Sequence, residues 1–140
     1  MPQVAEGTFE VTLKPLVVEE APEDSQIGRM SIDKTISGDL IATTRGQMLS
    51  AGTATKGSAG YVAMEQVTGT LNGRKGTFIL QHSATMNRGE PSMRITVVPD
   101  SGTRELEGLV GEFRIDIVDG KHLYEFTYHL DGDKAGTGGE

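Results

Sequence analysis

The chain has 140 residues, no cysteine and a formal net charge of −7. The length predicts one domain with one core, and the absence of cysteine excludes disulfides, thiolate metal ligands and cysteine nucleophiles. The acidic balance argues against a nucleic-acid partner, because such binding needs clustered Lys and Arg. The sequence shows neither a signal peptide nor an apolar run long enough for a spanning helix. We therefore expect a cytoplasmic protein without a membrane partner.

The first third of the chain predicts two strands. Residues 8–14 alternate strictly between apolar and polar side chains, with Phe9 at the start of the apolar face, and this is typical of a half-buried strand. We expect Pro15 to end it. Residues 29–36 form the second predicted strand, and Lys34 lies on its apolar face.

The third predicted strand, residues 40–50, has two possible inward faces. A two-residue turn before it would point Arg45 inward, where this side chain has no obvious partner. We therefore favour a three-residue turn at 37–39, which points the other face inward. That face carries Leu40, Ala42, Thr44, Gly46 and Met48.

Residues 60–85 predict a β-hairpin with its turn at Asn72-Gly73. A type II′ turn would place Glu65 directly opposite His82, whereas a type I′ turn would shift the pairing by two residues and make them diagonal neighbours. We favour the type II′ turn. Either turn leaves the two faces unchanged, and in both cases Glu65 and His82 lie in the middle of the apolar face. Such local conflicts are expected at functional or strained sites.

The last third predicts a strand over 93–99, a bulge or bend in the glycine-broken stretch 106–111, and a final hairpin over 112–130. Asp119-Gly120 is a strong type I′ turn signal. Its register places Phe113 opposite Phe126. Residues 131–140 contain no core-forming side chain, so we expect a disordered tail after a domain that spans 1–130.

About eight strands with short turns and no helical periodicity predict an all-β protein. Eight antiparallel strands can close into a barrel and leave no free edge. A two-sheet sandwich is the alternative, but only 5% of the residues are aromatic and tryptophan is absent, so a wide double layer would be hard to fill. We therefore predict an eight-stranded antiparallel calycin-like β-barrel with at most a short helical turn.

Several segments together form a family pattern between about Phe9 and Ile117. They include KTISGDL at 34–40, VTGTL at 67–71 and VVPDSGT at 97–103. The pattern resembles an uncharacterised bacterial protein family whose members resemble the allene oxide cyclase barrel. The resemblance implies an eight-stranded calycin-like barrel and no activity, because fold does not imply function. Arg104 stands where the pattern leads us to expect glycine.

Lys34, Glu65 and His82 form the candidate site, because each lies on the apolar face of its strand. A charge in an apolar interior is unfavourable unless it is paired or reaches water. We therefore predict that the three side chains converge inside the barrel. Tyr61 and Tyr128 are further candidates, since their phenols can add hydrogen bonds.

Three functions compete. An eight-stranded barrel holds packed side chains or one small ligand, so we first predict a protein that binds a small apolar or amphipathic ligand in its lumen, through the five candidate residues. The second hypothesis is an isomerase or cyclase-like enzyme that uses Glu65 and His82 as acid and base. The third is a structural or oligomerisation module in which the polar cluster binds no ligand.

The sequence also leads to expectations about cofactors and self-association. No histidine pair has the spacing of metal ligands, so we predict neither a metal nor a cofactor. Closed barrels often bury outward apolar side chains against a partner. We therefore expect a homo-oligomer with Val62, Met64 and Ile79 at its interface.

Overall fold

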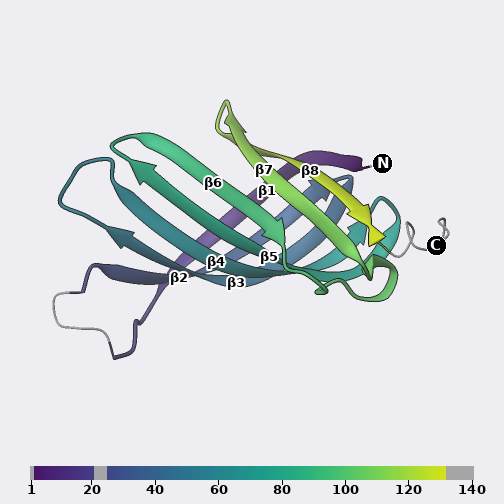
Figure 1. The fold of residues 1–140 in the computed structure, drawn as a ribbon, viewed down its shortest axis with the longest axis horizontal. Helices are drawn as coiled ribbons and strands as arrows, with labels where there is room; N and C mark the ends of the chain where they lie inside the picture. Colours follow the sequence, from purple (N-terminus) through teal and green to yellow (C-terminus); the bar gives the residue numbers. More distant parts are fainter. Residues whose placement is uncertain (1, 21–24, 132–140) are drawn as a thin grey trace.

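The computed structural model describes residues 2–20 and 25–131. Each strand has one apolar face, and together the strands close into a barrel with these faces inside (Figure 1). Neighbours in the chain are neighbours in the closed barrel, and every pair is antiparallel. The predicted all-β, eight-stranded barrel is thus confirmed. The predicted tail, 131–140, lies outside the described residues except for Asp131. The elements are β1 (Gln3–Leu16), β2 (Ile27–Gly38), β3 (Leu40–Gly52), β4 (Ala59–Leu71), β5 (Arg74–Asn87), β6 (Glu90–Val97), the 3-10 turn η1 (Arg104–Leu106), β7 (Leu109–Val118) and β8 (Lys121–Leu130).

The β4–β5 hairpin adopts the second of the two predicted registers. Asn72 and Gly73 have φ values of 47° and 86°, as a type I′ turn requires. Leu71 pairs with Arg74, and Glu65 therefore lies opposite Leu80. The favoured type II′ register was wrong, because asparagine tolerates the left-handed conformation and the type I′ turn matches the twist of the strands.

The other predicted faces agree with the structure. The inner face of β3 is the one that begins with Leu40 and includes Thr44, and Phe113 lies opposite Phe126 in the β7–β8 hairpin. Pro15 does not end β1, which continues to Leu16. The registered pairs of β1 with β8 stop at Phe9. Pro15 therefore lies on a free edge, where its missing N–H removes no ladder bond.

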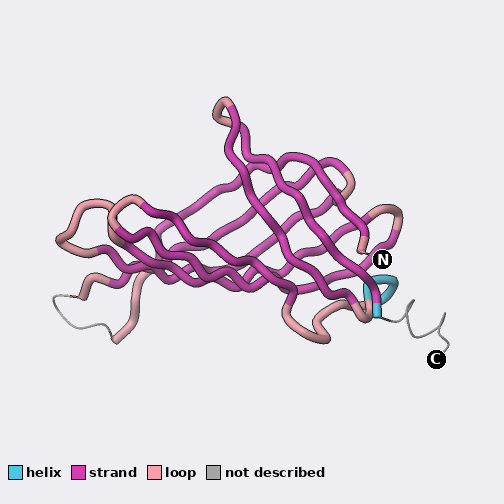
Figure 2. Tube along the Cα trace, turned by 45° about the horizontal axis from the view of Figure 1, so that its top comes forward, coloured by secondary structure: helices cyan, strands magenta, loops and turns pink. Residues whose placement is uncertain are grey.

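The barrel is filled at one end and open at the other. The β6–β7 ladder of the described residues has one registered pair, Thr96 with Glu112, and β6 diverges from β7 beyond it (Figure 1). The tip of the β7–β8 hairpin stands clear of the neighbouring strands (Figure 2). Strands β3 to β6 consequently form the wall of an open trough at this end. The filled end is packed with stacked and tilted rings of Phe78, Phe113, Tyr124, Phe126 and Tyr128.

The backbone at Arg104 gives a testable prediction. Its φ is 54°, in the left-handed region that favours glycine over residues with a Cβ. We expect Arg104→Gly to have a free energy of unfolding about 1 kcal/mol higher than Arg104→Ala, measured by urea denaturation. The same pair of substitutions at Arg94, an exposed position of strand β6, should give the opposite order. A glycine variant that is the less stable one at both positions would contradict the argument.

Candidate functional site

A buried polar network lies where the filled end of the barrel meets the open end. Lys34 comes from β2, Thr44 from β3, Glu65 from β4 and His82 from β5, so four neighbouring strands each contribute one side chain. Each of the four residues is at most 5% exposed. They face inward because alternation gives them the same face as their apolar neighbours.

Glu65 is the centre of this network. Its Oε1 accepts hydrogen bonds from Nζ of Lys34 at 3.2 Å and from Nε2 of His82 at 2.8 Å. Its Oε2 accepts a hydrogen bond from Oγ1 of Thr44 at 2.5 Å. The Thr44 hydroxyl in turn accepts the backbone N–H of Lys34 at 3.0 Å. Three donors therefore satisfy a fully buried carboxylate.

The surroundings keep Glu65 ionised. Burial alone would raise its pKa, but the hydrogen bond from His82, the charge of Lys34 and the hydrogen bond from Thr44 together hold that pKa below its usual value. A carboxylate can only accept hydrogen bonds, so Nε2 of His82 must be the donor. In a neutral imidazole the other nitrogen, Nδ1, then carries a free lone pair. This Nδ1 is buried and has no hydrogen-bond partner among the described residues.

The ammonium of Lys34 also contacts aromatic rings. Its Nζ lies 4.8 Å from the ring centroid of Phe9 and 5.9 Å from that of Phe113. Both distances are within the range of cation–π attraction. The positive charge is therefore stabilised by the carboxylate and by the rings at the top of the filled core.

Gly46 allows β3 and β4 to approach each other beside Glu65. The two residues are opposite partners in the ladder. A Cβ atom at Gly46 would clash with the carbonyl oxygen of Met64 and lie 2.8 Å from Cα of Glu65. Backbone atoms cannot move aside cheaply, so this position requires glycine. Together with Thr44, it is a part of the site that the sequence prediction did not identify as functional. The sequence feature that could have identified Gly46 is a glycine on the inward face of a predicted strand.

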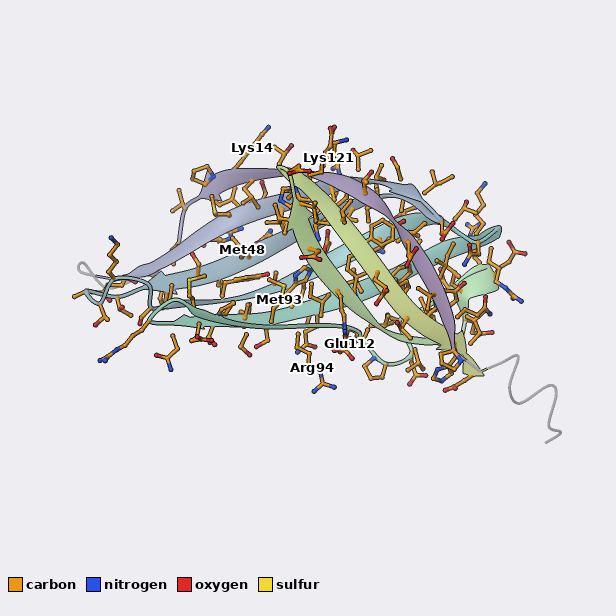
Figure 3. All side chains as sticks on the ribbon, turned by 90° about the horizontal axis from the view of Figure 1, so that it is seen from above. Lys14, Met48, Met93, Arg94, Glu112 and Lys121 are labelled. Atoms are coloured by element: carbon orange, nitrogen blue, oxygen red, sulfur yellow. The ribbon has the colours of Figure 1, made fainter. Side chains whose placement is uncertain are left out.

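A trough with a volume of about 560 Å³ begins above the network and runs to the open end. Its wall includes inward-facing side chains of β3, β4, β5 and β6: Met48, Tyr61, Ala84, Met86 and Met93. Met48 and Met93 lie on the inner side of the strands, whereas Arg94 points away (Figure 3). The rim is formed by the 52–58 loop. This loop is tied to the β5–β6 turn by hydrogen bonds from the N–H groups of Gly89 and Arg88 to Gly57 and Ser58.

Tyr61 lies between the trough and the polar network. Its ring centroid is 6.2 Å from that of His82, with the rings tilted by 45°, and its side chain lines the trough. Burial, and then the negative charge of Glu65, raise the pKa of Tyr61. The phenol therefore keeps its proton near neutral pH. Lys34, Glu65 and His82 themselves lie below the trough rather than along its wall.

Tyr128 lies at the opposite end of the barrel. Its hydroxyl accepts a hydrogen bond from Nδ2 of Asn72 at 2.6 Å and contacts Oε1 of Gln3 at 3.2 Å. Its ring packs against Phe126 in the filled core. The structure thus groups four of the five predicted site residues and does not bring Tyr128 to them. A role in ligand binding stays a prediction for all five.

Two further observations concern the part of the chain that the structure describes. None of its helical segments is both long and apolar enough to cross a membrane. Within the same residues, no three His, Asp or Glu side chains gather closely enough to bind a metal ion.

The chain is thus a small antiparallel β-barrel with a filled end, an open end and a buried carboxylate between them. The chain belongs to the family described as protein of unknown function DUF3224, whose profile matches residues 5–128. It is similar to the crystal structure of a protein of unknown function from this family in Shewanella oneidensis MR-1. The two are 46% identical with a TM-score of 0.88, over 93% of this chain and 98% of that chain.

The comparison with curated proteins found no match. The predicted membership of an uncharacterised family is therefore confirmed. The predicted likeness to the allene oxide cyclase barrel is not shown by these findings.

The network predicts a strong effect of removing its carboxylate. We expect Glu65→Ala to lower the free energy of unfolding by about 3–5 kcal/mol, because Lys34 would be left buried without its acceptor. Urea denaturation measures this difference. Glu10→Ala, at an exposed position of β1, is the control and should change stability by less than about 0.5 kcal/mol. A Glu65 variant as stable as the Glu10 variant would contradict a buried ion pair.

The lowered pKa of Glu65 predicts acid sensitivity. A carboxyl group whose pKa is lower in the folded chain stabilises the fold above its unfolded pKa, which is near 4.5 for Glu. This stabilisation is lost as the pH falls through the folded pKa. Wild-type protein should therefore lose stability more steeply than Glu65→Gln when the pH is lowered from about 5 to about 3. Parallel stability curves for the two proteins would contradict the lowered pKa.

Proposed function

We propose that this protein binds a small apolar or amphipathic molecule in the trough at the open end of the barrel. The observation that carries the proposal is the exposure of apolar side chains on the inner face, where a filled barrel would bury them. Met93 is 51% exposed and Met86 is 45% exposed, and both line the trough. Concave apolar surfaces with a few polar groups are the usual form of small-molecule sites.

The size and composition of the trough support this function. A volume of about 560 Å³ lies within the range of about 300–1,000 Å³ typical of ligand sites. Three of its inward side chains are the methionines Met48, Met86 and Met93. Their unbranched, polarisable side chains adapt to ligands of irregular shape. The hydrogen-bonded rim supports a site that is formed before the ligand arrives.

The polar network supports binding of the polar part of an amphipathic ligand at the same end of the barrel. Tyr61 offers a hydroxyl at the wall, and Glu65 and His82 lie behind it. An amphipathic ligand would place its apolar part among the methionines and its polar part toward Tyr61. The site proposed here is therefore higher in the barrel than the lumenal site predicted from the sequence, because aromatic rings fill the lower part.

An acid–base enzyme is the second candidate function. It is favoured by the contact between His82 and Glu65 at 2.8 Å, since a carboxylate that orients an imidazole leaves the other ring nitrogen available as a base. A bound molecule that exchanges carbon-bound hydrogen for deuterium in heavy water, with wild type but not with Glu65→Gln, would favour this function over simple binding.

Self-association remains a prediction. Val62 and Met64 are each 52% exposed on the outer face of β4, and Ile79 is half-buried on β5. These side chains are consistent with the predicted homo-oligomer.

The binding function is tested with N-phenyl-1-naphthylamine, a neutral apolar probe whose fluorescence rises in apolar sites. We expect wild-type protein to bind it and Met93→Lys to bind it at least about tenfold more weakly, because the substitution removes apolar contact and brings a charge into the trough. Met64→Lys is the matched control. It changes the same residue type at nearly the same exposure, 52% against 51%, but on the outer face.

Equal losses in both variants, or no binding to wild type, would contradict a ligand site in the trough. Native mass spectrometry of the protein purified from its own host identifies the natural ligand. A retained small molecule that is absent from Met93→Lys would support the proposal.

A further inference from the structure

We propose that the molecule held in the trough is uncharged and carries a hydrogen-bond donor, a hydroxyl group above all, which binds Nδ1 of His82. This inference rests on the proposed function and names the chemical class of its ligand.

The first argument is the unpaired nitrogen. His82 is 1% exposed, and its Nε2 is committed to Glu65. Its Nδ1 has no partner among the described residues. In the neutral ring this nitrogen is an acceptor, and a buried acceptor without a donor is unfavourable and is rare in folded proteins. A donor brought by a ligand would satisfy it, whereas an ether or ester oxygen would not.

The second argument is the position of this nitrogen. The two nitrogens of an imidazole point in diverging directions, so Nδ1 points away from Glu65. His82 lies opposite Ala63, and Tyr61 lies opposite Ala84 in the same ladder. Tyr61 lines the trough, and its ring centroid lies 6.2 Å from that of His82. Rotation of the half-buried Tyr61 side chain would let a ligand hydroxyl reach the imidazole.

The third argument is charge. Lys34 and Glu65 form a pair at 3.2 Å with side chains 3% and 0% exposed, so the network is already neutral when His82 is neutral. An ionised ligand group beside it would be a third buried charge without a partner. Lys56 lies on the rim of the trough. An anionic ligand could bind in the opposite orientation, with its charged group at Lys56 on the rim rather than at His82. The experiment distinguishes these two orientations.

The experiment compares how well four competitors, each with eight carbon atoms, displace N-phenyl-1-naphthylamine from wild-type protein at about pH 8. Octan-1-ol has a hydroxyl donor, and heptyl methyl ether is its isomer without a donor. Octanoate and octylammonium carry the two charges. We expect octan-1-ol to bind about tenfold more tightly than the other three, since one satisfied buried acceptor contributes about that factor.

Equal binding of octan-1-ol and its ether isomer would overturn the inference and leave the binding function intact. Tightest binding of octanoate would also overturn it and would favour the orientation toward Lys56. Failure of every competitor and of the probe would overturn both this inference and the proposed function.

Two further measurements locate the contact at His82. Nitrogen-15 NMR of wild-type protein should show the Nε2–H tautomer, and octan-1-ol but not the ether should shift the Nδ1 resonance. His82→Phe should bind the probe and lose the preference for the alcohol. His129→Phe makes the same change at a partly exposed position of β8 outside the trough, and it should keep the preference. An Nδ1 resonance unmoved by bound octan-1-ol would overturn the inference even if His82→Phe did not fold.

Discussion

The buried carboxylate of Glu65 is the constraint on which the rest of this barrel depends. A fully buried negative charge is tolerated only with close donors, and here the donors come from three different strands, through Lys34, Thr44 and His82. A slip of any of these strands by one residue would turn its donor to the outer face. The carboxylate therefore favours one register across β2, β3, β4 and β5, beyond what apolar alternation alone would specify.

The position of the network along the barrel also separates two environments. On one side, aromatic rings fill the interior and cover the ammonium of Lys34. On the other side, the long strands continue without β7 and β8 beside them (Figure 1). Apolar side chains there, such as Met93, have no opposing layer and stay exposed. The same polar group thus ends the core and forms the floor below the trough.

Turn chemistry predicted register well in one hairpin and incompletely in another. Asp119-Gly120 favours a type I′ turn alone, and the pairing that this turn predicts for the last hairpin is observed. Asn72-Gly73 is followed by residues that also allow a type II′ turn, and the choice between them shifted the pairs by two positions. Glu65 and His82 still face the same way, because a shift by two preserves the face.

Local features of the chain predicted which side chains point inward, how many strands there are and which family pattern they carry, because alternation with period two and turn residues depend on neighbouring residues alone. The sequence placed five side chains on inward faces, those of Lys34, Tyr61, Glu65, His82 and Tyr128. It did not predict their depth, which is their position along the barrel axis. Depth depends on the tilt and stagger of strands in the closed barrel, so only the tertiary structure separated Tyr128 in the filled end from Tyr61 at the trough. The tertiary structure also decided that Thr44 completes the network and that Nδ1 of His82 is left without a partner among the described residues, because both follow from distances between strands that alternation does not set.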